Sequence, residues 1–218
     1  FPNYSNEESL VAYSILGGIP LYLSLFDDSI SIKENVIKNC LSTTGYLFNE
    51  IETLLRMELK ETYFYKNIML AINAGASAFN SIKDKVDEEA AKVAKYMNVL
   101  IHLGFIKKEV PCGEKEKSRN TLYSICDNYF AFYFAFIFKH QNMLNGLISP
   151  ELYYEREFTK EKLNSFIYFI RNIAKRIATK IPNTIRTIFA TLTKITESFS
   201  TSAPESVTIF GDSKSYGG

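Results

Sequence analysis

The central part of the chain, residues 87–127, combines a helical hydrophobic pattern with a strand pattern. Apolar residues recur there at three- and four-residue steps, which predicts one buried helix face formed by Val93, Met97, Leu100, Ile101 and Phe105. Asp87 is the predicted N-cap, and Gly104 stands where the helix should end. Two short strand patterns, residues 105–111 and 121–126, then flank a polar loop. The pattern predicts a helix followed by a β-hairpin, the C-terminal half of a winged helix-turn-helix.

Helical patterns also cover most of the chain outside this unit, so the predicted fold class is mainly α with a small β-hairpin. The predicted helical segments are residues 6–16, a long amphipathic stretch at 35–59, 62–75, 79–86, the aromatic run 129–138, and 160–181. The segments at 62–75 and 79–86 would supply the first two helices of the winged helix. The aromatic run contains no basic residue, so we expect a buried core helix rather than a surface on which bases stack.

Two glycines and a proline form a predicted corner between helices at Gly17, Gly18, Ile19 and Pro20. The string Gly-Gly-Ile-Pro-x-Tyr-Leu at residues 17–23 resembles a corner in the small helical lid of the archaeal-type ATPases of the AAA superfamily. Residues 45–52 resemble a helix of the same lid, and residues 124–137 resemble the junction that leads into the family's C-terminal nuclease-like domain. The chain is therefore similar to the C-terminal part of such an ATPase, chiefly over residues 5–150.

The resemblance implies a division of the chain and a role for it. The implied regions are a helical lid-like region at 1–60, a winged helix at 61–127, a helical C-terminal region at 128–195 that is a diverged start of a nuclease-like domain, and a loose tail at 196–218. It also implies that an ATPase core, in cis or in trans, binds ATP and Mg²⁺ and that this chain couples the core to a partner or to nucleic acid. Since the first residue is Phe, we expect the chain to be a piece of a longer protein or a processed form.

Composition restricts these expectations. No Gly is followed by Lys, so the chain lacks a phosphate-binding loop, and we expect no cofactor and no independent ATP hydrolysis. Three cysteines are too few and too scattered for a disulfide framework or a zinc site. We therefore expect the protein to lie in the reducing cytoplasm. The longest apolar run is about half of the roughly 20 residues that span a bilayer, so we predict no membrane partner. No small-molecule substrate is predicted either.

Candidate nucleic-acid contacts lie on the predicted third helix and hairpin. They are Lys92, Lys95, Asn98, His102, Lys107, Lys108, Lys115, Lys117 and Arg119. Such side chains can reach phosphates or base edges. Against this alternative, the predicted helix begins with three acidic residues at 87–89, and Glu114 and Glu116 interrupt the basic loop. A further basic stretch, residues 162–194, has no acidic residue and could contact a membrane or nucleic acid, although a solvated helix face is the plainer interpretation.

No catalytic constellation or metal site is predicted. The only histidines, His102 and His140, have no nucleophile or carboxylate that the sequence can place beside them. A restriction-endonuclease-like site needs several carboxylates and a Lys. Asp212 and Lys214, with Glu205 or Glu197, match it only by residue type. The predicted function is a non-catalytic coupling portion of an ATP-binding protein; the alternatives are a DNA-binding winged helix or a remnant nuclease.

Overall fold

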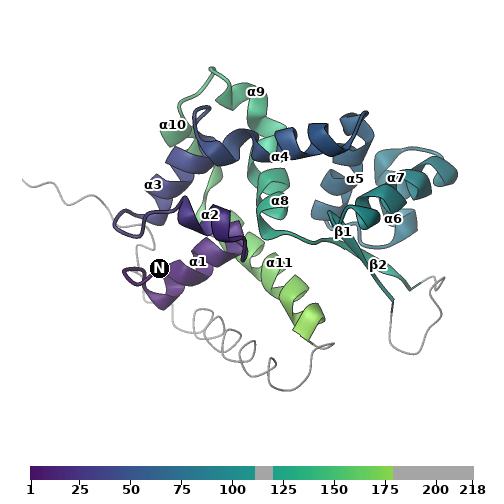
Figure 1. Ribbon diagram of the computed structural model, residues 1–218, viewed down its shortest axis with the longest axis horizontal. Helices are drawn as coiled ribbons and strands as arrows, with labels where there is room; N and C mark the ends of the chain where they lie inside the picture. Colours follow the sequence, from purple (N-terminus) through teal and green to yellow (C-terminus); the bar gives the residue numbers. More distant parts are fainter. Residues whose placement is uncertain (111–119, 179–218) are drawn as a thin grey trace, which may run out of the picture.

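The structure is a computed structural model that describes residues 1–110 and 120–178. Over these residues the chain is mainly helical and has one two-stranded antiparallel sheet (Figure 1). The sheet and helices α5–α7 lie at one end of the molecule, and α1–α3 and α10 lie at the other. Within the described part of the chain, no helix is both long enough and apolar enough to cross a membrane.

The first half of the chain forms a group of short helices. They are α1 (Asn6–Leu16), α2 (Pro20–Ser24), α3 (Ile32–Val36), the π-helical turn η1 (Ile37–Leu41) and α4 (Tyr46–Glu58). Ser5 caps α1 by accepting a hydrogen bond from the Glu8 amide, while the Glu8 side chain accepts one from the Ser5 amide. Pro20 occupies the first turn of α2, where its missing N–H costs no hydrogen bond. The predicted helix at 6–16 and the corner that follows it are confirmed.

The amphipathic stretch predicted at 35–59 is divided into pieces. In η1 the side chain of Asn39 donates from Nδ2 to the carbonyl of Asn35 at 3.1 Å and to that of Leu25 at 3.0 Å. The chain then turns at Gly45, where an added Cβ would lie only 2.5 Å from the carbonyl oxygens of Lys38 and Asn39. Close backbone packing therefore ends the first piece, and α4 starts afresh.

The middle of the chain forms a helix-and-hairpin unit. Its elements are α5 (Thr62–Asn73), α6 (Phe79–Val86), α7 (Ala90–His102), β1 (Ile106–Glu109) and β2 (Leu122–Ile125). The two strands are antiparallel, with Ile106 opposite Ile125 and Glu109 opposite Leu122. An isolated bridge joins Ala78, just before α6, to Leu122. The predicted helix followed by a hairpin is confirmed.

The predicted N-cap of the third helix is wrong. Asp87 adopts the left-handed conformation, with φ 56° and ψ 52°, and ends α6 rather than starting α7. Aspartate tolerates this conformation better than most residues because its short polar side chain can bond locally. Glu89 occupies the N-cap position of α7, and its side chain makes no capping hydrogen bond.

The aromatic run forms the centre of the molecule. The elements of this region are α8 (Asn128–Phe132), η2 (Tyr133–Ile137), η3 (Phe138–His140), α9 (Gln141–Leu144), α10 (Pro150–Glu157) and α11 (Lys160–Ala178). Tyr129, Phe132 and Tyr133 are fully buried, which confirms a buried helix. It is not a uniform α-helix, however, because η2 is a π turn and η3 a 3₁₀ turn. One continuous core cluster runs from Val11 to Ile170.

Several predictions fall outside the described residues. They concern the loop cations Lys115, Lys117 and Arg119, the part of the basic stretch 162–194 beyond residue 178, the tail at 196–218, and the nuclease-like candidates Glu197, Glu205, Asp212 and Lys214. The division of the chain into regions stays a prediction.

Candidate functional site

The corner at residues 17–20 lies directly against the start of α8. Gly17 has a φ of 67°, a conformation that side-chain-bearing residues rarely adopt. A Cβ at this position would lie 3.5 Å from Cβ of Asn128 and 3.7 Å from Oδ2 of Asp127. The corner backbone and the first residues of α8 are therefore in contact.

Hydrogen bonds also hold the corner against the start of α8. Asn128 donates from Nδ2 to the carbonyl oxygen of Tyr13 at 2.9 Å, and the amide of Gly17 donates to that oxygen at 2.8 Å. Asp127 caps α8, since its Oδ1 accepts a hydrogen bond from the amide of Phe130 at 3.0 Å. Burial raises the pKa of the Asp127 carboxyl. One carbonyl of α1 thus joins the corner to α8.

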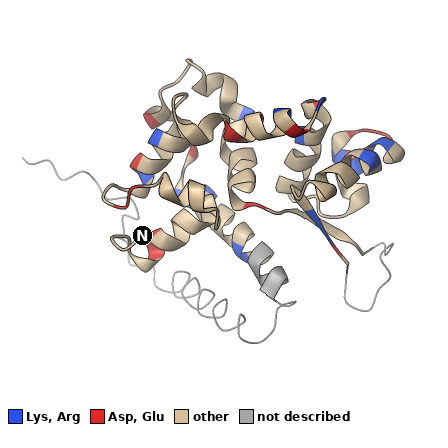
Figure 2. Cartoon of the chain, viewed as in Figure 1, with Lys and Arg blue, Asp and Glu red and all other residues tan. Residues whose placement is uncertain are grey.

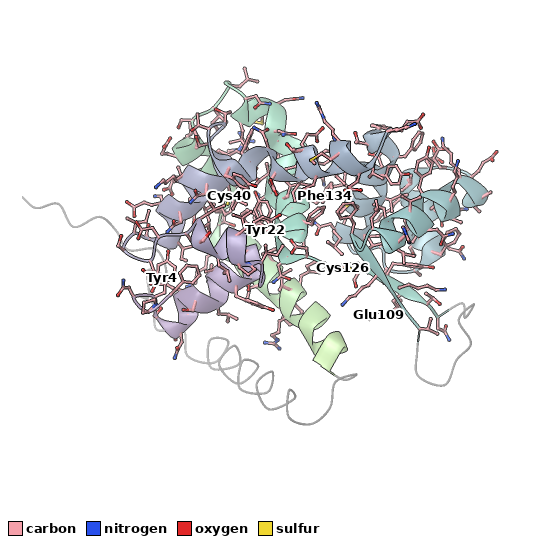
Figure 3. All side chains as sticks on the ribbon, viewed as in Figure 1. Tyr4, Tyr22, Cys40, Glu109, Cys126 and Phe134 are labelled. Atoms are coloured by element: carbon pink, nitrogen blue, oxygen red, sulfur yellow. The ribbon has the colours of Figure 1, made fainter. Side chains whose placement is uncertain are left out.

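The hairpin leads straight into this contact. Strand β2 ends at Ile125, and the amide of Cys126 donates to the carbonyl of Phe105 at 3.0 Å. Asp127 and Asn128 follow without an intervening loop. Figure 3 shows Cys126 and Glu109 at the hairpin and Tyr22 nearer the middle of the molecule. The path from hairpin to corner is therefore only three residues long.

The outer side of the corner is apolar. Leu21 and Tyr46 are 49% and 50% exposed, whereas Tyr22 is buried. The Tyr22 ring meets that of Tyr129 edge-on at 5.4 Å, and its hydroxyl lies 3.5 Å from Oε1 of Glu50. Burial, then the charge of Glu50, raises the pKa of Tyr22. This side of the corner combines exposed apolar groups with a nearby carboxylate.

Three of the predicted nucleic-acid contacts lie together. Lys95, Asn98 and His102 are exposed on α7. They follow one another at three- and four-residue steps, so they form one stripe along the solvent-facing side of the helix. Lys108 is exposed on β1.

Other predicted cations are already paired. Lys92 lies 3.0 Å from Oε1 of Glu88, and its Nζ is 3.5 Å from the centre of the Phe64 ring. Lys107 lies 3.1 Å from Oε1 of Glu109. These two cations are therefore less available to a phosphate than the sequence suggests.

The turn between α6 and α7 is acidic. Lys83, Asp84, Asp87, Glu88 and Glu89 line an open hollow at this turn. Lys83 pairs with Asp84 at 2.9 Å, which leaves the carboxylates in excess. Figure 2 shows acidic and basic segments side by side on α6 and α7. The described part of this surface is thus not a continuous basic face.

The catalytic and metal predictions remain untested. Among residues 1–110 and 120–178, no group of three or more His, Cys, Asp or Glu side chains could hold a metal ion. The His140 ring packs 5.6 Å from that of Tyr153. Sequence reasoning missed Asn128 as a site residue, because its partner Tyr13 lies 115 positions away and leaves no local signal.

Comparison with known proteins gives one distant relative. The chain is 28% identical over 170 residues to Uncharacterized protein MJECL04 of Methanocaldococcus jannaschii. The alignment covers 78% of this chain but 37% of that protein, so the chain spans little more than a third of the relative's length. No family model matches the chain, and no solved structure matches it.

Proposed function

We propose that this chain is the non-catalytic coupling portion of an archaeal-type ATP-binding protein. Its corner packs on an ATPase core, and its helix-and-hairpin unit transmits the motion to a partner or to nucleic acid. The observation that carries this proposal is the hydrogen bond from Asn128, the first residue of α8, to the Tyr13 carbonyl beside the corner, three residues after β2 ends. In this proposal a displacement of the corner moves α8 and, through the chain that connects them, β2.

The order of elements supports interpreting the helix-and-hairpin unit as a winged helix. A helix (α5) precedes a short bridged segment at Ala78, two helices (α6 and α7) follow, and a hairpin (β1 and β2) ends the unit. The amide of Tyr123 donates to the carbonyl of Ser77 at 2.7 Å, so the bridged segment lies beside β2, where the first strand of a winged helix would lie. Winged helices have this order of helices and strands, and the assignment rests on fold-level analogy.

The corner itself does not fit a nucleotide phosphate. The Gly17 amide is used by the Tyr13 carbonyl, and Pro20 has no amide to offer. Residues 1–32 contain no Lys or Arg to balance phosphate charge. In this proposal ATP and Mg²⁺ therefore belong to the core, and the corner acts as a docking surface beside them.

The docking role can be tested by site-specific photo-cross-linking in cells that produce the chain. A photoreactive amino acid replaces Leu21 at the corner, and in a matched control it replaces Leu152, which is 60% exposed on α10. The proposal predicts that the Leu21 position captures a polypeptide with a phosphate-binding loop and that the Leu152 position does not. Capture of no such ATPase from Leu21, or equal capture from both positions, would contradict it.

The exposed stripe on α7 favours a second candidate function, duplex DNA binding. Lys95, Asn98 and His102 could enter a groove together. The test is binding of a labelled duplex over a salt titration, comparing Lys95→Glu with Lys139→Glu, which reverses an exposed lysine elsewhere in the fold. If the stripe binds DNA, the affinity for the duplex should fall steeply as the salt concentration rises. Binding should be lost in Lys95→Glu and kept in Lys139→Glu. Nonspecific binding that both variants weaken equally would reject this candidate.

A further inference from the structure

One side chain replaces a backbone hydrogen bond inside the aromatic helix. Asn73 is the last residue of α5. We assign its side-chain amide the orientation that gives both atoms a partner, in which Nδ2 donates to the Ala131 carbonyl at 3.2 Å and Oδ1 accepts from the Ala135 amide at 3.1 Å. In an α-helix the Ala135 amide would bond to the Ala131 carbonyl directly. The Asn73 amide therefore stands between two groups that would otherwise pair with each other.

The helix changes its winding at this place. In η2 the amide of Phe138 donates to the carbonyl of Tyr133, five residues earlier, and the tighter 3₁₀ turn η3 follows. A π turn contains one residue more than an α turn, and a side chain inserted into the hydrogen-bond ladder is a known cause of such irregularities. The insertion of Asn73 thus gives η2 a physical cause.

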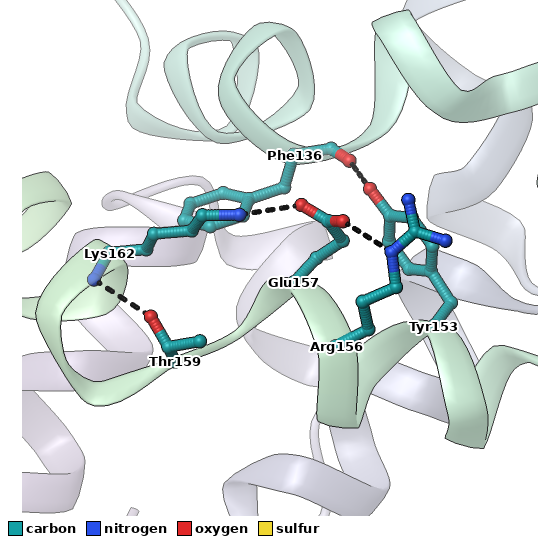
Figure 4. Close-up of polar contacts among 6 residues, drawn as sticks. All are labelled: Phe136, Tyr153, Arg156, Glu157, Thr159 and Lys162. Carbon is teal, nitrogen blue, oxygen red and sulfur yellow. Dashed lines mark hydrogen bonds and ion pairs between the residues drawn. The ribbon is translucent and has the colours of Figure 1, made fainter.

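Groups just beyond the insertion contact α10 and α11. Tyr153 of α10 donates its hydroxyl hydrogen bond to the Phe136 carbonyl (Figure 4). The Phe136 ring lies 4.6 Å from that of Phe158 and 5.5 Å from that of Phe166, measured between centroids. Since Phe158 follows α10 and Phe166 belongs to α11, the winding of η2 fixes where these two helices pack.

We propose that the segment α8–η2 has two registers and that Asn73 is the latch that selects between them. With Asn73 inserted, the helix keeps its π turn. When α5 moves away from α8, the Ala135 amide bonds to the Ala131 carbonyl, the π turn becomes an α turn, and the following residues rotate by about 100°, the angle of one residue. This discrete change carries a displacement of the helix-and-hairpin unit to α10 and α11. It goes beyond the proposed function and needs no particular partner.

Backbone NMR of the purified chain tests the latch. Asn73→Leu removes both hydrogen bonds at similar volume, and Asn73→Ala, which also removes both, is read by the same criteria if the first variant does not fold. Asn80→Ala, at an exposed position of α6, is the control. The latch predicts a hydrogen-bond coupling between the Ala135 nitrogen and the Ala131 carbonyl carbon in the variant. Ala135 exchange should stay within about threefold of the parent chain, while the ring resonances of Phe136 and Phe158 shift.

Two results would overturn the latch. One is the absence of that coupling together with Ala135 exchange faster by more than about tenfold, as for an amide left without a partner. The other is an unchanged π pattern from Tyr133 to Phe138 in the variant. Either result would mean that Asn73 only binds to a π turn and does not select between two registers.

Discussion

The side-chain amide of Asn128 donates to the carbonyl oxygen of Tyr13 at 2.9 Å and so joins two segments 115 positions apart. Tyr13 belongs to the last turn and a half of α1, and Asn128 opens α8 three residues after β2 ends. The same carbonyl accepts the Gly17 amide. Corner, central helix and hairpin therefore share one small junction, on which the proposed coupling role depends.

The close approach at Gly45 predicts a steric effect of a single methyl group. Gly45→Ala would bring a Cβ to 2.5 Å from two backbone oxygens, those of Lys38 and Asn39. Because backbone cannot give way as a flexible side chain can, we expect the free energy of unfolding to fall by about 1–3 kcal/mol. Chemical denaturation measures the change. Gly18→Ala is the matched control, since nothing lies within 4 Å of its added Cβ, and unchanged stability of Gly45→Ala would refute the close approach.

The buried hydroxyl of Tyr129 predicts that its removal lowers stability without changing the packing of the ring. It donates to the carbonyl of Leu47 at 2.7 Å and ties α8 to α4. Tyr129→Phe should lower the free energy of unfolding by about 0.5–1.5 kcal/mol, the usual net value of one hydrogen bond. Tyr168→Phe, at an exposed position of α11, should have no measurable effect. Equal effects of the two substitutions in denaturant titrations would argue against this tie.

The ion pair between Glu52 and Lys66 predicts a pH dependence of stability. The Lys66 Nζ lies 2.7 Å from Oε1 and 2.5 Å from Oε2 of Glu52, and the two side chains are only 13% and 17% exposed. Burial by itself raises the pKa of Glu52, but the hydrogen bonds and charges of Lys66 and Arg56 together outweigh it, so the pKa lies below its ordinary value of 4.5. The pair therefore stabilises the fold fully above pH 4.5, and this stability is lost as the pH falls through the lowered pKa.

Two variants isolate this effect. Glu52→Gln should lower the free energy of unfolding at pH 7 by about 1–3 kcal/mol, between the values for exposed and for fully buried pairs. It should also flatten the fall in stability between pH 5 and pH 3, roughly the range in which carboxyl groups titrate. Adding Lys66→Met should recover part of the loss at pH 7, because the only charge then left without Glu52 is that of Arg56, which is 72% exposed. A pH profile identical in the parent chain and Glu52→Gln would show that other carboxyl groups dominate.

Local signals in the sequence predict the helices well. The segments predicted at 6–16 and 79–86 have the bounds of α1 and α6, because capping by Ser5 and the apolar spacing act within a few residues. The hairpin is likewise a local pattern. The interruption of the aromatic helix is not, since Asn73 reaches it from another helix. For the same reason the sequence shows Lys92 as a solvent-exposed cation, whereas the fold places the Phe64 ring beneath it.

Hydrogen exchange measured by mass spectrometry on Asn128→Ala tests the central claim most directly. If the corner and the hairpin are one mechanical unit, loss of the Asn128 hydrogen bond should speed amide exchange by a similar factor in residues 17–23, which hold the corner and most of α2, and in β2. Asn49→Ala, an exposed position on α4, should change neither. Faster exchange confined to the corner, with β2 unchanged from the parent chain, would contradict the coupling that the junction implies.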